Sequence, residues 1–246
     1  MVPGIDPKID YAFKRLFGSE ANEPLLIHLL NAVLQPPPAQ RVAALEILNP
    51  FNDKEALDDK LSVVDIKARD QLGRQFNIEM QLLPYAGFPQ RVLYYWARLH
   101  QRQLHESEKY EELRPTISIC FVNRILFPRV PAYHLSFRLW EAVHQVAFTD
   151  DLAIHMLELP KFTRLADELT TELDEWLYFL RYAEKLDTEA LPPALRVEEI
   201  QQAMEVLAML TQSDLERERY EARLKLERDR LSFEAHMQRL ATEGRE

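Results

Sequence analysis

The N-terminal part of the chain has hydrophobic residues at helical spacing. An apolar stripe along residues 6–17 is formed by Ile9, Phe13, Leu16 and Phe17. This segment begins with an Asp-Pro pair, which is typical of a helix start. Residues 23–34 form a second apolar segment, and the prolines at 36–38 end it. We therefore predict two consecutive helices.

Short segments with β-type patterning fill the middle of the chain. Their residues are mostly apolar or alternate between apolar and polar, which is typical of strands buried on both faces or on one. We predict strands over residues 41–48, 61–68, 75–83, 114–123, 133–141 and 152–160. The amphipathic segment 89–104 predicts a helix between the third and fourth of these strands.

From Phe162 on, the pattern is helical. We predict helices over residues 164–186 and 197–210, with Pro192 and Pro193 between them. Residues 214–246 alternate acids and bases, which is typical of a solvated helix with ion pairs between successive turns. The alternative for this tail is a helix that pairs with a second copy of the chain or with another partner.

The composition excludes several kinds of protein. The chain has 246 residues and a net charge of −10, so any contact with nucleic acid has to be local. Five scattered glycines form no phosphate-binding loop, and the seven histidines lack the spacing of a zinc site. The single cysteine, Cys120, excludes an internal disulfide and is expected to be a small buried residue of a cytoplasmic protein. No apolar run is long enough to cross a membrane.

The predicted strands around Gly73 form a hairpin with a polar side. A three-residue loop that ends at Gly73 places Asp70 opposite Arg74, and counting back places Asp65 opposite Glu79. Directly opposed side chains have Cβ atoms about 5 Å apart, where two like charges repel each other. The pairing depends on this register, because a shift by one residue would break it.

Two opposed carboxylates can share a divalent cation instead of repelling each other. Mg²⁺ is usually held by one or two carboxylates, with water and phosphate oxygens completing its shell. Gln81 shares a face with Glu79 and could orient a water, and Lys67 shares a face with Asp65 and could meet phosphate. The alternative is a solvent-facing amphipathic hairpin whose acids have no catalytic role.

The same residues carry a resemblance to a known family. The hairpin VVDIKARDQLGRQFNIEMQ resembles the active site of the PD-(D/E)xK nuclease superfamily, in which an Asp on one strand is followed by Glu-x-Lys or Glu-x-Gln on the next. The blocks IDYAFKRLFG, LLIHLLNAVL, QRVLYYWARLHQRQL, KYEELRPTISICFVN and LELPKF occur in the same order as in the Rpn family of recombination-promoting nucleases and transposases. The resemblance covers residues 5–165.

This resemblance implies a fold and an activity. The expected fold is α/β, with a mixed β-sheet flanked by helices and a C-terminal helical extension. The expected domains are a PD-(D/E)xK nuclease-like domain over 1–165, a helical region packed on or beside it over 166–212, and a charged helix over 213–246. The expected activity is DNA endonuclease cleavage that depends on Mg²⁺ or Mn²⁺ and serves recombination or mobile-element DNA.

The resemblance also assigns roles to individual residues. Asp65 and Glu79 match the motif acids that hold the metal, and Gln81 stands in the place of the motif Lys. Asp10 fits the additional acid that this superfamily often brings to the metal. An exposed acid in the first turn of a helix is the ordinary alternative for Asp10.

Two positions depart from the superfamily pattern. Val64 stands where the superfamily name has Pro, and Gln81 cannot supply the positive charge of the motif Lys. Activation of water must then rest more on the metal, with Lys67 or Lys60 as a replacement for the missing charge. Within the family a Gln is expected at this place.

The helix predicted after the hairpin offers contacts to DNA. Arg91, Tyr95 and Arg98 recur at one face of this helix, where the arginines could contact phosphates and the tyrosine a sugar or base. The alternative is that the aromatic residues of this segment belong to the core or to an interface. For the whole protein we weigh an endonuclease against a non-catalytic DNA- or protein-binding module on a nuclease fold, and against a structural protein that acts through its C-terminal helices. The expected partners are DNA and a second copy of the chain, which would pair through the C-terminal helices.

Overall fold

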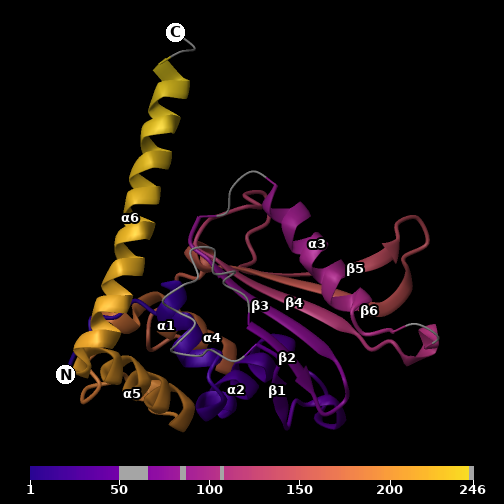
Figure 1. Cartoon of the computed structure of the whole chain (residues 1–246), viewed down its shortest axis with the longest axis horizontal. Helices are drawn as coiled ribbons and strands as arrows, with labels where there is room; N and C mark the ends of the chain where they lie inside the picture. Colours follow the sequence, from indigo (N-terminus) through magenta and orange to yellow (C-terminus); the bar gives the residue numbers. More distant parts are fainter. Residues whose placement is uncertain (50–65, 84–86, 106–107, 244–246) are drawn as a thin grey trace.

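A mixed β-sheet forms the centre of the fold in the computed structural model, which describes residues 1–49, 66–83, 87–105 and 108–243 (Figure 1). The strands of the described part are β1 Leu45–Ile47, β2 Ile66–Asp70, β3 Gln75–Gln81, β4 Thr116–Val122, β5 His134–Glu141 and β6 Val146–Glu158. Their order in the sheet is β1-β2-β3-β4-β6-β5. The first three strands and the β5–β6 pair are antiparallel, whereas β3, β4 and β6 run parallel to one another.

Helices cover both faces of this sheet, as predicted for a PD-(D/E)xK nuclease-like α/β fold (Figure 1). The α-helices of the described part are α1 Asp10–Phe17, α2 Glu23–Leu34, α3 Phe88–Gln101, α4 Glu172–Tyr182, α5 Glu198–Gln212 and α6 Asp214–Glu243. Short 3-10 helices lie at Glu20–Asn22, Pro38–Gln40, Tyr110–Glu112, Leu159–Lys161, Ala183–Lys185 and Pro193–Leu195. None of the described helices has the length and apolar character needed to cross a membrane.

The β2–β3 hairpin has the register that its loop predicts. Ile66 pairs with Ile78, and the pairing continues without interruption to Arg69 opposite Gln75. Gly73 has φ of +79°, the left-handed conformation that favours glycine, at the end of the loop. The Asp70 side chain accepts hydrogen bonds from the backbone N–H of Leu72 and is paired with the Arg74 guanidinium at 2.6 Å. The predicted partner of Glu79, Asp65, lies outside the described residues.

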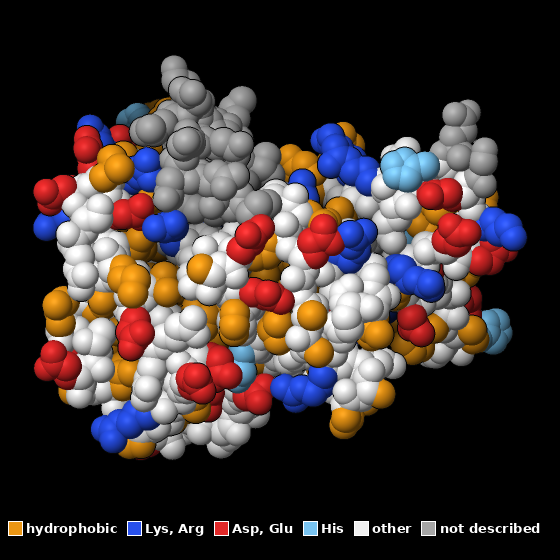
Figure 2. Space-filling model, turned by 60° about the horizontal axis from the view of Figure 1, so that its bottom comes forward, with side chains coloured by type: hydrophobic (Ala, Val, Ile, Leu, Met, Phe, Trp, Pro, Cys, Tyr) orange, Lys and Arg blue, Asp and Glu red, His pale blue; other side chains and the backbone are white. Residues whose placement is uncertain are grey.

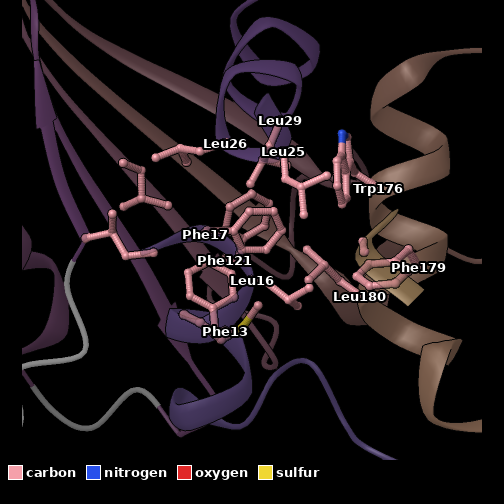
Figure 3. Packing of buried hydrophobic residues seen from close by; sticks show 14 of the residues in the cluster. Phe13, Leu16, Phe17, Leu25, Leu26, Leu29, Phe121, Trp176, Phe179 and Leu180 are labelled. Atoms are coloured by element: carbon pink, nitrogen blue, oxygen red, sulfur yellow. The ribbon is translucent and has the colours of Figure 1, made fainter. Parts of the chain in front are cut away.

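One face of the sheet packs against four helices in a large hydrophobic core. Apolar side chains of β2, β3, β4 and β6 meet those of α1, α2, α4 and α5 (Figure 3). The Phe13 and Phe121 rings lie 6.1 Å apart, and the Phe17 and Trp176 rings 5.4 Å apart. The Trp176 indole N–H also donates to His28 Nδ1 at 2.8 Å, so the buried ring keeps its hydrogen bond. The helices after residue 165 therefore belong to the same core as α1 and α2.

Helix α4 is shorter than predicted. The periodicity indicated a helix from residue 164, but α4 begins at Glu172. Thr171 and Asp174 form a reciprocal capping box, in which each side chain accepts from the backbone N–H of the other residue. The cap starts the helix at this point, and the residues before it form turns.

The first part of α6 is packed, which corrects the prediction of a solvated helix. Tyr220 is 4% exposed and belongs to the main core, and its hydroxyl accepts a hydrogen bond from Asp6 N–H at 2.8 Å. Glu216 accepts from the Tyr11 hydroxyl at 2.7 Å. Burial raises the pKa of both tyrosines to about 12, so their hydroxyls stay protonated and can donate. The C-terminal end of α6 projects away from the other elements (Figure 1).

Candidate active site

A row of polar side chains on β3 is buried under α3. Gln75, Asn77, Glu79 and Gln81 point to the same side of the strand and are 8%, 1%, 2% and 6% exposed. The prediction that these four residues share a face is confirmed. The alternative of a solvent-facing hairpin is wrong for β3, because both faces of this strand are covered.

Helix α3 is fixed over β3 and β4 by polar contacts as well as by packing. The Trp96 indole N–H donates to the Thr116 carbonyl oxygen at 2.7 Å, and His100 Nδ1 lies 3.0 Å from the Thr116 hydroxyl. The His100 ring stacks on Trp96, and burial lowers its pKa. Phe88 and Val92 pack on Cys120, which is buried as predicted. Of the aromatic residues on this helix, Trp96 is thus an interface residue, whereas Tyr94 is 60% exposed.

The Arg91 guanidinium of α3 joins the last two polar residues of the row on β3. Its Nη2 donates to Glu79 Oε1 and, at 2.8 Å, to Gln81 Oε1. The side-chain amide of Gln81 donates in turn to the Leu83 carbonyl oxygen at 2.9 Å, which fixes the orientation of the amide. A buried carboxylate is costly unless it is paired, and the guanidinium supplies that charge for Glu79.

The donor atoms of this row fit a hard divalent cation. Glu79 and Gln81 direct one oxygen each at a single cationic nitrogen, so the two oxygens converge on one point. Asn77 Oδ1 and Ser118 Oγ, buried in adjacent positions of β3 and β4, have no hydrogen-bond partner among the described residues. Carboxylate and carbonyl oxygens are the ligands that Mg²⁺ and Mn²⁺ prefer. The described residues contain no cluster of three His, Cys, Asp or Glu side chains, and Asp65 is not among them.

The predicted third acid lies on α1, against α6. Asp10 is the first residue of α1, and its Oδ1 accepts from the backbone N–H of Tyr11 at 2.7 Å. Its other oxygen lies 3.9 Å from Arg223 Nη1 of α6. Seven residues further along α6, Arg230 donates to the Leu83 carbonyl oxygen at 3.4 Å. Helix α6 therefore contacts both Asp10 and the segment that follows β3, a contact that the charge pattern of the tail did not predict.

Lys67 is opposite Asn77 and not opposite Glu79. It lines a cleft that opens toward the end of α3. Gln81, which is also a predicted catalytic residue, lies with Glu79 beneath Arg91 at the end of β3. Lys67 and Gln81 thus occupy different parts of the same polar face.

The three predicted DNA-contact residues differ in their surroundings. Arg91 is directed at β3, whereas Arg98 is exposed. Tyr95 is half-buried, with its ring 5.7 Å from that of Tyr94. Sequence reasoning missed the contact of Arg91 with Glu79, because nothing in the spacing of α3 tells which of its arginines faces the sheet.

The block LELPKF has a structural role in this molecule. Glu158 is fully buried at the end of β6, where it accepts from the backbone N–H groups of Leu126 and Phe127 and pairs with Lys161. Lys161 donates to the Phe127 carbonyl oxygen at 2.9 Å. This buried pair holds the connection between β4 and β5 in place.

Comparison with known proteins places the chain in a family. Residues 7–235 match the family model described as PD-(D/E)XK nuclease family transposase. No curated protein and no solved structure matches the chain. The family match spans the buried Glu79 and Gln81 of β3, the sheet and most of the C-terminal helix. The chain therefore belongs to the PD-(D/E)XK nuclease family transposases.

Proposed function

We propose that this protein is a metal-dependent DNA endonuclease that hydrolyses phosphodiester bonds and acts in recombination or in the movement of mobile DNA. The observation that carries the proposal is the convergence of Glu79 and Gln81 oxygens on one cationic nitrogen, in a hairpin of the expected register. Membership of a nuclease transposase family supports DNA as the substrate. The cytoplasm remains the compartment predicted from the single cysteine.

The proposed roles follow the chemistry of the side chains. Asp65, Glu79 and Asp10 would hold Mg²⁺, or Mn²⁺ in its place. A cation bound there would lower the pKa of a water ligand and stabilise negative charge on the phosphate. The Gln81 amide, oriented by the Leu83 carbonyl, can hold a water by hydrogen bonding, although it cannot accept a proton from it. Lys67 would contribute positive charge toward the DNA.

The predicted DNA-binding residues on α3 stay part of this proposal. Arg98 is exposed and Tyr95 is half-buried, so both can contribute to a surface for the DNA backbone. Arg91 lies beside Glu79, where its guanidinium can stabilise negative charge on a bound phosphate.

A non-catalytic DNA- or protein-binding module is the second candidate, and one observation favours it. Arg91 already neutralises Glu79, and Gln81 lacks the charge of the motif Lys. On this alternative, Glu79 and Arg91 are a buried structural pair that ties α3 to β3. The protein would then bind DNA and cut none of it in Mg²⁺.

Cleavage of supercoiled plasmid distinguishes the two candidates. We expect cutting in Mg²⁺ that EDTA abolishes, and a rate at least about 100-fold lower for Glu79→Gln and for Asp65→Asn. Glu79→Gln also leaves the Arg91 charge unpaired, so the double variant Glu79→Gln/Arg91→Gln serves to keep the fold intact. Glu205→Gln, at an exposed position of α5, is the matched control. Cutting by Glu79→Gln at the parent rate would exclude the proposed site.

We also propose that the chain forms a homodimer through α6. The side chains of Leu226, Phe233, Met237 and Leu240 recur on one side of this helix and are 59%, 64%, 48% and 48% exposed. Such a stripe suits a second copy of the same helix. Light scattering should give half the mass for Phe233→Glu/Leu240→Glu, with Ser232→Glu as the control on another side of the helix. An unchanged mass would exclude this interface.

The domain division predicted above is kept as a proposal, with residues 1–165 as the nuclease-like domain, 166–212 as the helical region and 213–246 as the charged helix. The packing of α4 and α5 into the core of α1 and α2 supports a helical region attached to the first domain.

A further inference from the structure

A polar cleft of about 530 Å³ lies on the same face of the sheet as Glu79, toward the other end of β3. Side chains from β2, from the start of β3, from the end of α3 and from the segment before β4 line it. Gln75 is the β3 residue at its wall, four positions before Glu79. At about 3.3 Å per residue, these two positions are roughly 13 Å apart along the strand.

Basic side chains converge on this cleft from three separate segments. Lys67 and Arg69 come from β2, Arg102 from the end of α3, and Arg114 from the segment before β4. Within the part of the chain that the structure describes, no carboxylate forms an ion pair with Lys67, Arg102 or Arg114, whereas Arg69 is paired with Glu46. Glu112 is the acid among the lining residues.

The charge of the cleft contrasts with that of the whole chain. The net charge is −10, and acidic and basic side chains are mixed over the face drawn in Figure 2. The cleft therefore has a local excess of positive charge, including guanidinium groups without ion-pair partners among the described residues, although the chain as a whole is acidic. Such groups bind phosphate strongly, because a guanidinium presents two parallel donors to two oxygens.

The cleft is built from fixed backbone. Gln103 donates to the Arg114 carbonyl oxygen and accepts from the Arg114 N–H, each at 3.0 Å. The Arg114 side chain lies against Gly73, where a Cβ would come within 3.1 Å of its Cγ. Gln75 N–H donates to the Pro115 carbonyl oxygen at 2.9 Å, which ties the same segment to β3. The position of Arg114 is therefore set by α3 and by the hairpin loop together.

We propose that this cleft binds two neighbouring backbone phosphates of the DNA, one at Arg102 and one at Arg114, about four base pairs from the bond that is cut, since 13 Å corresponds to about four steps of 3.4 Å along a duplex. This inference rests on the proposed endonuclease function and identifies an anchoring site for its substrate. Among the described residues that line the cleft there is no Phe, Tyr or Trp, so these residues offer no stacking platform for a base. Contacts to phosphate alone position DNA without reading its sequence.

Binding of a labelled DNA duplex of mixed sequence, measured by fluorescence anisotropy in EDTA at several salt concentrations, tests this site. We expect Arg102→Gln/Arg114→Gln to weaken binding about tenfold and to reduce the slope of log affinity against log salt by about 2, because each lost phosphate contact removes about 0.9. The control Lys185→Gln/Arg217→Gln removes the same net charge from exposed ion pairs elsewhere. It should keep the parent slope.

Several outcomes would overturn the inference. These are no binding by the parent protein, an equal loss in the control, or an unchanged slope in the cleft variant. Competition by inorganic phosphate at micromolar concentration would identify a small-anion pocket and would also overturn it. If the double variant does not fold, the single variant Arg102→Gln, which leaves Arg114 and its Gln103 contacts intact, should still reduce the slope by about 1.

Measuring DNA binding and plasmid cleavage separately distinguishes the anchoring site from the proposed endonuclease activity. Glu79→Gln should lose cleavage and keep the parent salt slope, because it lies outside the cleft. A protein that binds through the cleft and never cuts plasmid would retain the anchoring site and exclude the endonuclease.

Discussion

The two faces of the central sheet differ in what they bury. Beneath α1, α2, α4 and α5 the sheet contributes mainly apolar side chains to one large core (Figure 3). Beneath α3, three buried apolar residues of the sheet join two of the helix in a small cluster, beside the row Gln75, Asn77, Glu79 and Gln81. The first face supplies most of the buried apolar area, and the second buries polar groups that need partners.

The apolar face therefore contributes mainly to the stability of the fold, and the polar face contains the candidate active site. A change on the apolar face should lower the free energy of unfolding and leave the candidate active site chemically intact. A change in the polar row should alter cleavage more than stability, provided that no buried charge is left unpaired. Substitutions on each of the two faces test this division.

The largest effect is expected from Phe121→Ala on the apolar face. Phe121 is fully buried and its ring lies 6.1 Å from that of Phe13, so its removal should leave a cavity. We expect a loss of about 3–5 kcal/mol in the free energy of unfolding, measured by urea denaturation. Phe148→Ala, at a position that is 81% exposed, should change it by less than about 0.5 kcal/mol. Similar losses for both variants would contradict the assignment of the core.

A smaller effect is expected from substitutions of Gln81 on the polar face. Gln81→Leu keeps the size of the side chain but removes the oxygen that faces Arg91 and the amide that bonds Leu83. Its plasmid cleavage should fall by about 10- to 100-fold.

Gln81→Lys should retain or raise the cleavage rate, because an ammonium supplies the charge that the amide lacks and shares Glu79 with Arg91. Equal rates for the parent, Leu and Lys forms would remove Gln81 from the site. A drop in unfolding free energy that matches the drop in rate would instead assign it a structural role.

The smallest effect concerns His155, which lies beside Ile119 on the apolar face. Burial, with smaller contributions from His134 and Arg138, lowers the pKa of His155 to about 3 from an ordinary value of 6.5. Between about pH 3 and pH 6.5, the His155 side chain therefore binds a proton in the unfolded chain but not in the folded protein. Stability should fall as the pH drops below about 6.5, by about 1–2 kcal/mol between about pH 7 and pH 5.

The variant His155→Leu isolates this contribution. Its unfolding free energy, from urea denaturation at the two pH values, should change less with pH than that of the parent. His236→Leu, at an exposed position of α6, should keep the parent's dependence. If His155→Leu has the same pH dependence as the parent, other groups are responsible for it.

The local geometry of the hairpin follows from the amino-acid sequence alone. The alternation along residues 75–81 assigns each side chain to a face, because the strand has a period of two. The loop ending at Gly73 sets the register, since the left-handed residue there is a glycine and the loop length fixes the pairing. The order of helices and strands, and with it the α/β class, also followed from periodicity and from the resemblance to a known family.

Which polar groups meet depends instead on how the helices and strands pack on one another. Alternation places Glu79 on a polar face but does not tell whether that face is open or covered, and the burial comes from α3. The pairing of Arg91 with Glu79 joins residues twelve positions apart on different elements. The packing of Tyr220 joins α6 to Asp6, across the length of the chain.

The convergence of basic side chains in the cleft could not be predicted from the sequence either. Lys67, Arg102 and Arg114 lie in three separate segments of the sequence, and nothing in these segments indicates that the three side chains meet. They converge because α3 crosses from β3 to the parallel β4, which places the end of the helix over the start of both strands. Local spacing carries no information about such contacts, because they depend on how whole elements pack on one another.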